Sequence, residues 1–226
     1  DVLPVFCAWL TKKPSATYLV AYSSHYEGKL QLPWPCKKCL KSKHFVLIMS
    51  RDLLTAEDLS GQLNRKVSFL GNAFMDPVIS SKYSLPKCKY RIGLLPGSRQ
   101  PELSRNLLLI LEMIKYLPSQ LIREGDLKLE LALVNSLDDA SLKELVSKNG
   151  WELQQNSYNQ DLEIYFQGLI ISARRSSFSL ILNNSDIVIC MAGTAAEQAV
   201  GLSKPVLQIA GEGPQFTHSF AEAQRR

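Results

Sequence analysis

Residues 185–205, SDIVICMAGTAAEQAVGLSKP, constrain the fold of this chain more than any other stretch. Positions 187–190 are apolar and rich in β-branched residues, which is typical of a buried strand in a parallel sheet. A turn that contains Gly193 follows, and the good helix formers at 195–202 predict a helix that ends before Pro205. We therefore expect a strand, a turn and a helix, with a further strand at 206–209.

The start of this expected helix has the properties of an anion site. Backbone N–H groups in the first turn of a helix have no intrahelical acceptor, and the helix dipole places partial positive charge there. A phosphate group binds well at such a position. An ordinary strand–helix turn without a ligand has the same local pattern, so a second signal has to decide between the two interpretations.

That second signal is the turn at 96–99. It follows an expected strand at 91–95 and contains Gly97, Ser98 and Arg99. Gly97 lets the backbone approach a ligand closely, and the Arg99 guanidinium can bind two phosphate oxygens at once. Because the carboxyl ends of parallel strands lie at one edge of a sheet, we expect both turns to face one crevice.

The chain as a whole predicts an α/β fold in two parts. Residues 90–226 alternate between apolar strands and amphipathic helices, which predicts a doubly wound parallel sheet. The polar, lysine-rich stretch 81–89 predicts a linker, so that 1–80 form a first domain and 90–226 a second.

Local patterns place the individual elements. In the first domain we expect a helix at 55–63, with Thr55 as its N-cap. The strands expected there are 2–9, 17–22, 45–49 and 67–70. In the second domain the further strands expected are 127–133 and one or two within 163–172, and the further helices are 102–117, 138–149 and 176–184.

Composition limits the class of protein. The 226 residues are 46% hydrophobic and carry a net charge of +5, as in ordinary globular proteins, and no apolar run approaches the ~18–20 residues of a membrane span. The first residues resemble neither a start nor a signal peptide, and 220–226 break off inside an expected helix. We expect the chain to be a piece of a longer protein.

The cysteines point to a cytoplasmic setting, and the lysines point to contact with a membrane surface. Five cysteines without a secretory signal favour reduced thiols. Cys36 and Cys39 have the spacing of metal ligands, but no second pair accompanies them, so no metal is expected. The lysine run at 37–43, close to Trp34, predicts loose peripheral contact with anionic lipid at the membrane surface.

Two motifs carry a resemblance to a known family. LLPGSR at 94–99, followed by Glu102, resembles the start of the C-terminal domain of lipid-A-disaccharide synthases, and 185–206 are similar to the family's strand–GTAT–helix segment. GPQFT at 213–217 and FAEAQ at 220–224 are similar to a related cyanobacterial branch. The resemblance implies the GT-B glycosyltransferase fold, with two Rossmann-like domains of parallel strands. The N-terminal domain would be incomplete and the C-terminal domain truncated.

The resemblance also implies a function in lipid A biosynthesis. A hexosamine-like sugar would pass from a UDP-sugar to a lipid-linked or glycan acceptor, without a cofactor, a metal or nucleic acid. Catalytic residues are expected mainly upstream of this chain, which by itself would bind the donor without turning it over. The donor-binding residues carried over are Gly97, Ser98, Arg99, Ala192, Gly193, Thr194, Glu197, Gln198, Gly213 and Gln215.

One carried-over position is ambiguous. The family holds the ribose hydroxyls with a carboxylate in the helix after the second turn. Counted back from the Lys204-Pro205 pair, that position is Gln198, and Glu197 lies one residue earlier, about 100° around the helix. A carboxylate accepts two charge-assisted bonds from a diol, which favours Glu197.

Two other functions stay open at this point. A UDP-sugar 2-epimerase-like isomerase would share the fold, but it requires acid–base carboxylates and histidines in the cleft, and this chain offers few. A non-catalytic nucleotide-binding relative would keep the phosphate turns without an acceptor site. The sequence carries no signal for an oligomeric state.

Overall fold

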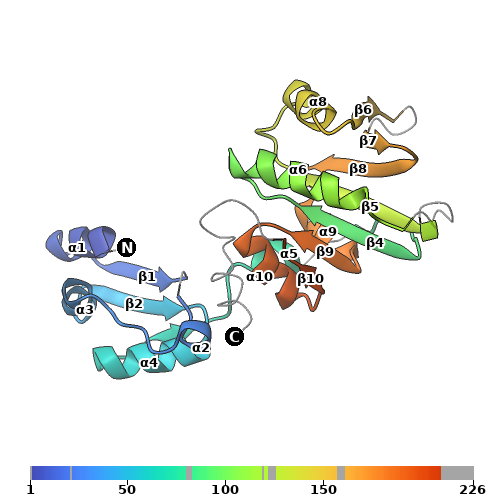
Figure 1. Ribbon diagram of the computed structural model, residues 1–226. Helices are drawn as coiled ribbons and strands as arrows, with labels where there is room; N and C mark the ends of the chain where they lie inside the picture. Colours follow the sequence, from blue (N-terminus) through green and yellow to red (C-terminus); the bar gives the residue numbers. More distant parts are fainter. Residues whose placement is uncertain are drawn as a thin grey trace. The chain divides into compact units, whose positions relative to one another are not determined.

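A computed structural model describes residues 2–20, 22–79, 83–118, 120–121, 126–156 and 161–209 of the chain. The described residues form two compact α/β units, one that ends at Ala73 and one that begins at Phe74 (Figure 1). Both units contain parallel strands with helices packed against them, so the expectation of an α/β fold is confirmed.

The first unit is built on a three-stranded parallel sheet in the order β1-β2-β3. Its elements are α1 (Val2–Leu10), β1 (Ser15–Leu19), α2 (Ser24–Glu27), α3 (Trp34–Leu40), β2 (Phe45–Ser50), α4 (Leu53–Leu63) and β3 (Ser68–Phe69). Its core joins buried side chains of α3, β2 and α4 with Val5 of α1.

The N-terminal apolar run is a helix, and the strand predicted at 2–9 is wrong. A short run that is apolar at nearly every position fits either structure by pattern. As a helix, it places Val5, Ala8 and Trp9 three and four residues apart on one face. That face packs against the core of the first unit, which local pattern does not reveal.

Helix α4 begins two residues before the predicted Thr55. Its N-cap is Asp52, whose Oδ1 accepts a hydrogen bond from the Thr55 backbone N–H at 2.8 Å. The Thr55 hydroxyl also donates to Asp52 Oδ2 at 2.8 Å. A carboxylate at this end additionally interacts favourably with the helix dipole, which explains why Asp52 caps the helix in place of Thr55.

The second unit is built on a seven-stranded sheet in the order β10-β9-β4-β5-β8-β7-β6. The strands are β4 (Tyr90–Leu95), β5 (Leu127–Leu133), β6 (Glu152–Gln155), β7 (Leu162–Phe166), β8 (Leu169–Arg175), β9 (Ile187–Cys190) and β10 (Val206–Leu207). The strands predicted at 127–133 and 187–190 are confirmed.

This sheet is mixed, which corrects the expectation of a purely parallel one. Strands β10, β9, β4, β5 and β8 are parallel, whereas β7 pairs antiparallel with both β8 and β6. Only Gln167 and Gly168 separate β7 from β8, and both have positive φ (46° and 89°). A two-residue turn with two positive φ angles joins antiparallel strands, and the sequence pattern at 163–172 did not resolve it.

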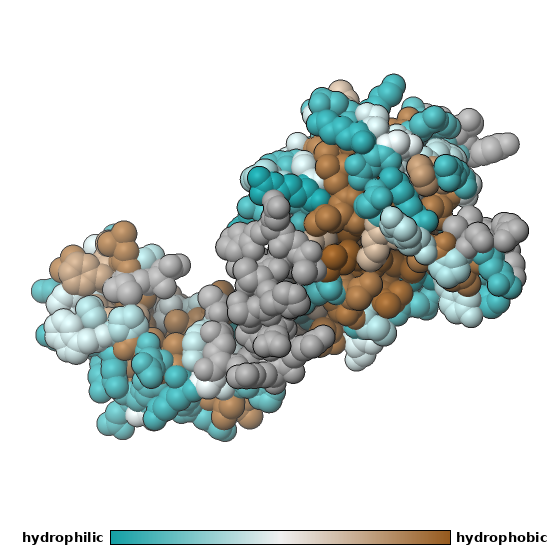
Figure 2. All heavy atoms as spheres, in the orientation of Figure 1, coloured by the Kyte–Doolittle hydropathy of each residue, from teal (hydrophilic) through white to brown (hydrophobic). Residues whose placement is uncertain are grey.

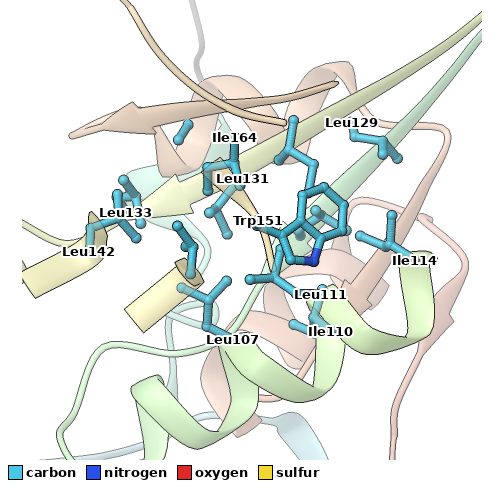
Figure 3. Close-up of a cluster of buried hydrophobic side chains, with 14 of the residues drawn as sticks. Leu107, Ile110, Leu111, Ile114, Leu129, Leu131, Leu133, Leu142, Trp151 and Ile164 are labelled. Carbon is cyan, nitrogen blue, oxygen red and sulfur yellow. The ribbon is translucent and has the colours of Figure 1, made fainter. Parts of the chain in front are cut away.

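Helices cover both faces of this sheet (Figure 1). They are α5 (Asp76–Ile79), α6 (Glu102–Ile114), α8 (Asp139–Ser147), α9 (Phe178–Asn184) and α10 (Gly193–Gly201). One core lies under α6 and α8 and surrounds Trp151 (Figure 3), and a second lies under α5, α9 and α10. Leu94 joins the first core and Leu95 the second, because neighbouring strand residues point to opposite faces.

The two units divide before the linker expected at 81–89. Asn183 Nδ2 donates to the Val78 carbonyl at 2.7 Å, and the Leu85 N–H donates to Asn184 Oδ1 at 3.0 Å. These hydrogen bonds attach the segment before β4 to α9 of the second unit. The polar composition of 81–89 does not reveal such attachment, because the two partners of each hydrogen bond lie about a hundred residues apart in the sequence.

None of the helices within the described ranges has the length and apolar character needed to cross a lipid bilayer.

Candidate functional site

The two glycine-containing turns lie side by side in the second unit. Strands β4 and β9 are parallel neighbours, with Leu95 opposite Cys190 at their carboxyl ends. From β4 the chain continues to β5 and β8 on one side, and it then returns to β9 and β10 on the other. The strand order therefore reverses between β4 and β9, and open α/β sheets bind their ligands at such a reversal.

A cavity of about 490 Å³ lies at this reversal. Both turns line it, together with the first turns of α6 and α10, the end of β5 and Phe178 at the start of α9. Its volume falls within the range of about 300–1,000 Å³ that is usual for small-molecule sites. The expectation that both turns face one crevice is thus met by the geometry.

The turn after β4 depends on Gly97. Its φ is +108°, in a region that residues with a side chain rarely adopt. Space is not the constraint, since a Cβ on Gly97 would lie 3.8 Å from both the Met191 carbonyl oxygen and the Ala192 Cβ. Gly97 is therefore required by conformation, and it packs directly against the second turn.

The start of α10 offers backbone donors to the cavity. Ala192 is the N-cap, with an extended backbone, and its side chain forms no capping hydrogen bond. The helix begins at Gly193, two residues before the predicted 195, so Gly193 and Thr194 belong to its first turn. Both line the cavity, where the N–H groups of that turn provide partial positive charge.

The formal charges in the cavity wall are of both signs. Arg99 and Ser98 are exposed at the turn after β4. Glu102, in the first turn of α6, also lines the cavity and is half-buried. Since one carboxylate opposes one guanidinium, attraction for an anion depends on the helix start and on the fork geometry of Arg99.

Of the two ribose-ligand candidates, Gln198 lines the cavity and Glu197 does not. Gln198 is buried, and its Nε2 donates to the Phe74 carbonyl. Glu197 is half-buried one position earlier, about 100° around α10. The cavity wall thus includes the Gln198 position and not Glu197, while the role of either residue toward a ribose stays a prediction.

Gly213 and Gln215, the remaining candidates, lie outside the described residues, as do the motifs at 213–217 and 220–224.

Asn106 is a cavity residue that the sequence analysis missed. Its side chain is 1% exposed, and Nδ2 donates to the carbonyls of Pro96 at 2.9 Å and Met191 at 3.3 Å. Within the described ranges, Oδ1 has no hydrogen-bond partner. The signal was present in the sequence, since Asn106 lies three residues after Leu103 on the otherwise apolar face of α6.

Three of the five cysteines, Cys36, Cys39 and Cys190, are buried. Burial raises the pKa of the Cys190 thiol to about 11, and its Sγ donates to the Ala192 carbonyl at 3.2 Å. The thiol therefore stays protonated at neutral pH and is not a candidate nucleophile. Cys36 and Cys39 are buried in α3. In the described part of the chain, no three His, Cys, Asp or Glu side chains group closely enough to hold a metal ion.

No protein-family model matches the chain. A search of curated proteins likewise returns no significant match.

Proposed function

We propose that the second unit binds the diphosphate of a UDP-sugar, as the donor site of a GT-B glycosyltransferase of the lipid-A-disaccharide synthase type. One observation carries the proposal: two glycine-containing turns, an arginine and an uncapped helix start line a single cavity where the strand order reverses. Phosphates bind to this combination in open α/β sheets.

Each part of the site has a distinct role in this proposal. The Arg99 guanidinium binds phosphate oxygens in a two-pronged manner, and the first turn of α10 donates backbone N–H groups. These groups stabilise the negative charge that develops on UDP as it leaves during transfer. The apolar wall at Leu133, Val134 and Phe178 suits the less polar parts of the nucleotide.

The cavity supports transfer over epimerisation. Among its described lining residues Glu102 is the carboxylate, and no histidine lines it. A 2-epimerase requires acid–base groups at the sugar, whereas a transferase requires one base for the acceptor hydroxyl. We assign no base in this chain, and we expect it to bind the donor without turning it over.

Titration calorimetry with UDP tests the proposed site. We expect Arg99→Ala to weaken binding by about 1.5–3 kcal/mol, the range for a hydrogen bond to a charged group. Arg99→Lys should recover only part of this loss, because an ammonium does not reproduce the guanidinium fork. Arg105→Ala is the matched control, since Arg105 is exposed on α6 and does not line the cavity.

Equal UDP affinities of the wild type and Arg99→Ala would contradict the site. Saturation-transfer NMR with UDP-GlcNAc, UDP-glucose and GDP-mannose then separates the contribution of the nucleobase from that of the sugar.

A specific surface of the first unit supports a second role, peripheral association with anionic lipid at the cytoplasmic membrane face. Apolar side chains gather over α1 (Figure 2). Those exposed are Leu3 (72%), Phe6 (39%) and Leu10 (56%), and Trp34 at the start of α3 is 73% exposed. An exposed apolar helix is unusual in water, and basic residues beside it suit a negatively charged surface.

The lysines of this surface lie next to its aromatic residue. Lys38 Nζ is 5.6 Å from the centroid of the Trp34 ring. Lys12 and Lys13 follow α1 after Thr11, and Lys41 and Lys43 follow α3. Each lysine near an anionic surface contributes about 1 kcal/mol to binding.

Sedimentation with vesicles tests this surface. We expect the protein to pellet with phosphatidylserine-containing vesicles at low salt and to be released at high salt, because salt screens the lysines. Glutamine at Lys37, Lys38, Lys41 and Lys43 should abolish pelleting, whereas Lys143→Gln, at an exposed position of α8, should not. If the wild type fails to bind anionic vesicles at low salt, the role is excluded.

A further inference from the structure

A single buried amide connects the two turns of the cavity. Asn106 Nδ2 donates to the carbonyl of Pro96, which opens the first turn, and to that of Met191, which opens the second. The orientation of this amide is fixed, since a flipped amide would place Oδ1 against two carbonyl oxygens. One side chain therefore sets the positions of two peptide groups in turns that follow different strands.

Fixing these carbonyls also fixes two backbone donors. In a planar trans peptide, the N–H of the next residue points opposite to the carbonyl. The N–H groups of Gly97 and Ala192 consequently point away from the Asn106 amide, and both residues line the cavity. Asn106 thus controls the direction of one backbone donor on each turn.

Packing alone does not explain an asparagine at this position. The buried neighbours on the same face of α6 are Leu103, Leu107, Ile110, Leu111 and Ile114. In the part of the chain that is described, Asn106 Oδ1 is buried without a partner, which is uncommon in native proteins and costs stability. An apolar side chain of the same shape would avoid that cost, but it would leave both turn carbonyls without their donor.

We propose that Asn106 is the positioning residue of this cavity and that it holds the two turns in register for a ligand with two linked anionic groups. The inference rests on the proposed function, in which the cavity binds a nucleoside diphosphate. A diphosphate contacts both turns at once, so its affinity increases when the relative position of the turns is fixed. A monophosphate contacts one turn and gains little, so Asn106 determines the preference for diphosphate.

Calorimetry with UDP and UMP measures this preference. We expect wild type to bind UDP at least about tenfold more tightly than UMP, as one additional charged contact provides. In Asn106→Leu, UDP affinity should fall by about tenfold or more while UMP affinity changes by less than about threefold, so the preference disappears. Asn106→Asp should be more severe, because a carboxylate repels both carbonyl oxygens and donates to neither.

Asn149→Leu is the matched control. In the wild type, Asn149 Nδ2 donates to the Leu108 carbonyl at 3.2 Å, and Asn149 does not line the cavity. The variant therefore loses a similar hydrogen bond to the same helix α6. We expect it to leave the ratio of UDP to UMP affinity unchanged. A parallel decrease of both affinities in Asn106→Leu would overturn the proposal, since that pattern indicates general destabilisation.

Amide NMR spectra without ligand separate this proposal from the proposed function. Asn106→Leu should shift the backbone amide resonances of both Gly97 and Ala192, and Asn149→Leu should shift neither. If wild type binds no UDP, the proposed function fails, while the paired shifts still support the connection of the turns. Shifts confined to α6 would overturn the proposal that Asn106 connects the two turns.

Discussion

Glu130→Ala should lower the free energy of unfolding of the second unit by about 3–5 kcal/mol, the cost of breaking a buried ion pair. Glu130 lies in β5 and is 4% exposed. Arg174 Nε donates to its Oε2 at 2.9 Å, and Arg91 Nε lies 3.8 Å from its Oε1. Alanine removes the carboxylate that faces both arginines. Because Arg91 is only 6% exposed, its charge would then be buried without this partner.

Chemical denaturation followed by tryptophan fluorescence measures this loss. The tryptophans are Trp9, Trp34 and Trp151, so phenylalanine at the first two leaves Trp151 as the reporter of the second unit. The control is Glu144→Ala, which breaks an exposed pair with Lys148 and should cost about 0.3–0.5 kcal/mol.

The free energy of unfolding of Glu130→Gln should lie between those of wild type and Glu130→Ala, because the amide oxygen still accepts a hydrogen bond from Arg174. A triple variant with methionine at Arg91 and Arg174 and leucine at Glu130 should recover most of the loss, since it removes all three of these charges together and the Asp161 carboxylate, which loses Arg174, is partly exposed to water. A loss below about 1 kcal/mol in Glu130→Ala would mean that the other partners of these arginines, which are Asp161 for Arg174 and the Pro86 and Asn184 carbonyls for Arg91, suffice without Glu130.

Trp151→Ala is the second large effect, with an expected loss of about 3–5 kcal/mol. Trp151 is 1% exposed and lies within the core under α6 and α8, surrounded by the leucine and isoleucine side chains shown in Figure 3. Its ring centroid is 5.1 Å from that of Phe166. Alanine would leave a cavity that these strands and helices fill only in part.

Far-UV circular dichroism during urea unfolding measures this change without the tryptophan signal. Trp151→Phe should cost less than Trp151→Ala, because it keeps most of the packing and removes an Nε1 that is buried without a partner among the described residues. Trp34→Ala, at an exposed position of the first unit, should leave stability nearly unchanged. A comparable loss in both alanine variants would contradict the central place of Trp151.

Local chemistry determined several elements without knowledge of the fold. The apolar runs at 127–133 and 187–190 form the strands β5 and β9. The helix predicted at 138–149 has Asp138 as its N-cap, whose carboxylate accepts from the Ser141 N–H at 2.7 Å, and Gly150 follows its end with φ +75°. These features depend on residues close in sequence, so pattern and capping preferences suffice.

Elements that depend on distant partners were decided by tertiary contacts. The run at 2–10 is a helix because its apolar face packs against the core of the first unit. Strand β6 has no clear pattern of its own and exists through antiparallel pairing with β7. A short segment has too few local preferences to fix its structure, so the partner that buries it or completes its hydrogen bonds decides.

The candidate site divides in the same way. The sequence by itself determined which turns carry glycine, hydroxyl and guanidinium groups, because these are properties of single residues at 97–99 and 193–194. Only the tertiary structure decided that β4 and β9 are neighbours, that Gln198 and not Glu197 lines the cavity, and that Asn106 joins both turns. Strand order and the rotation of a helix about its axis follow from packing across the whole sheet, which no local stretch of sequence contains.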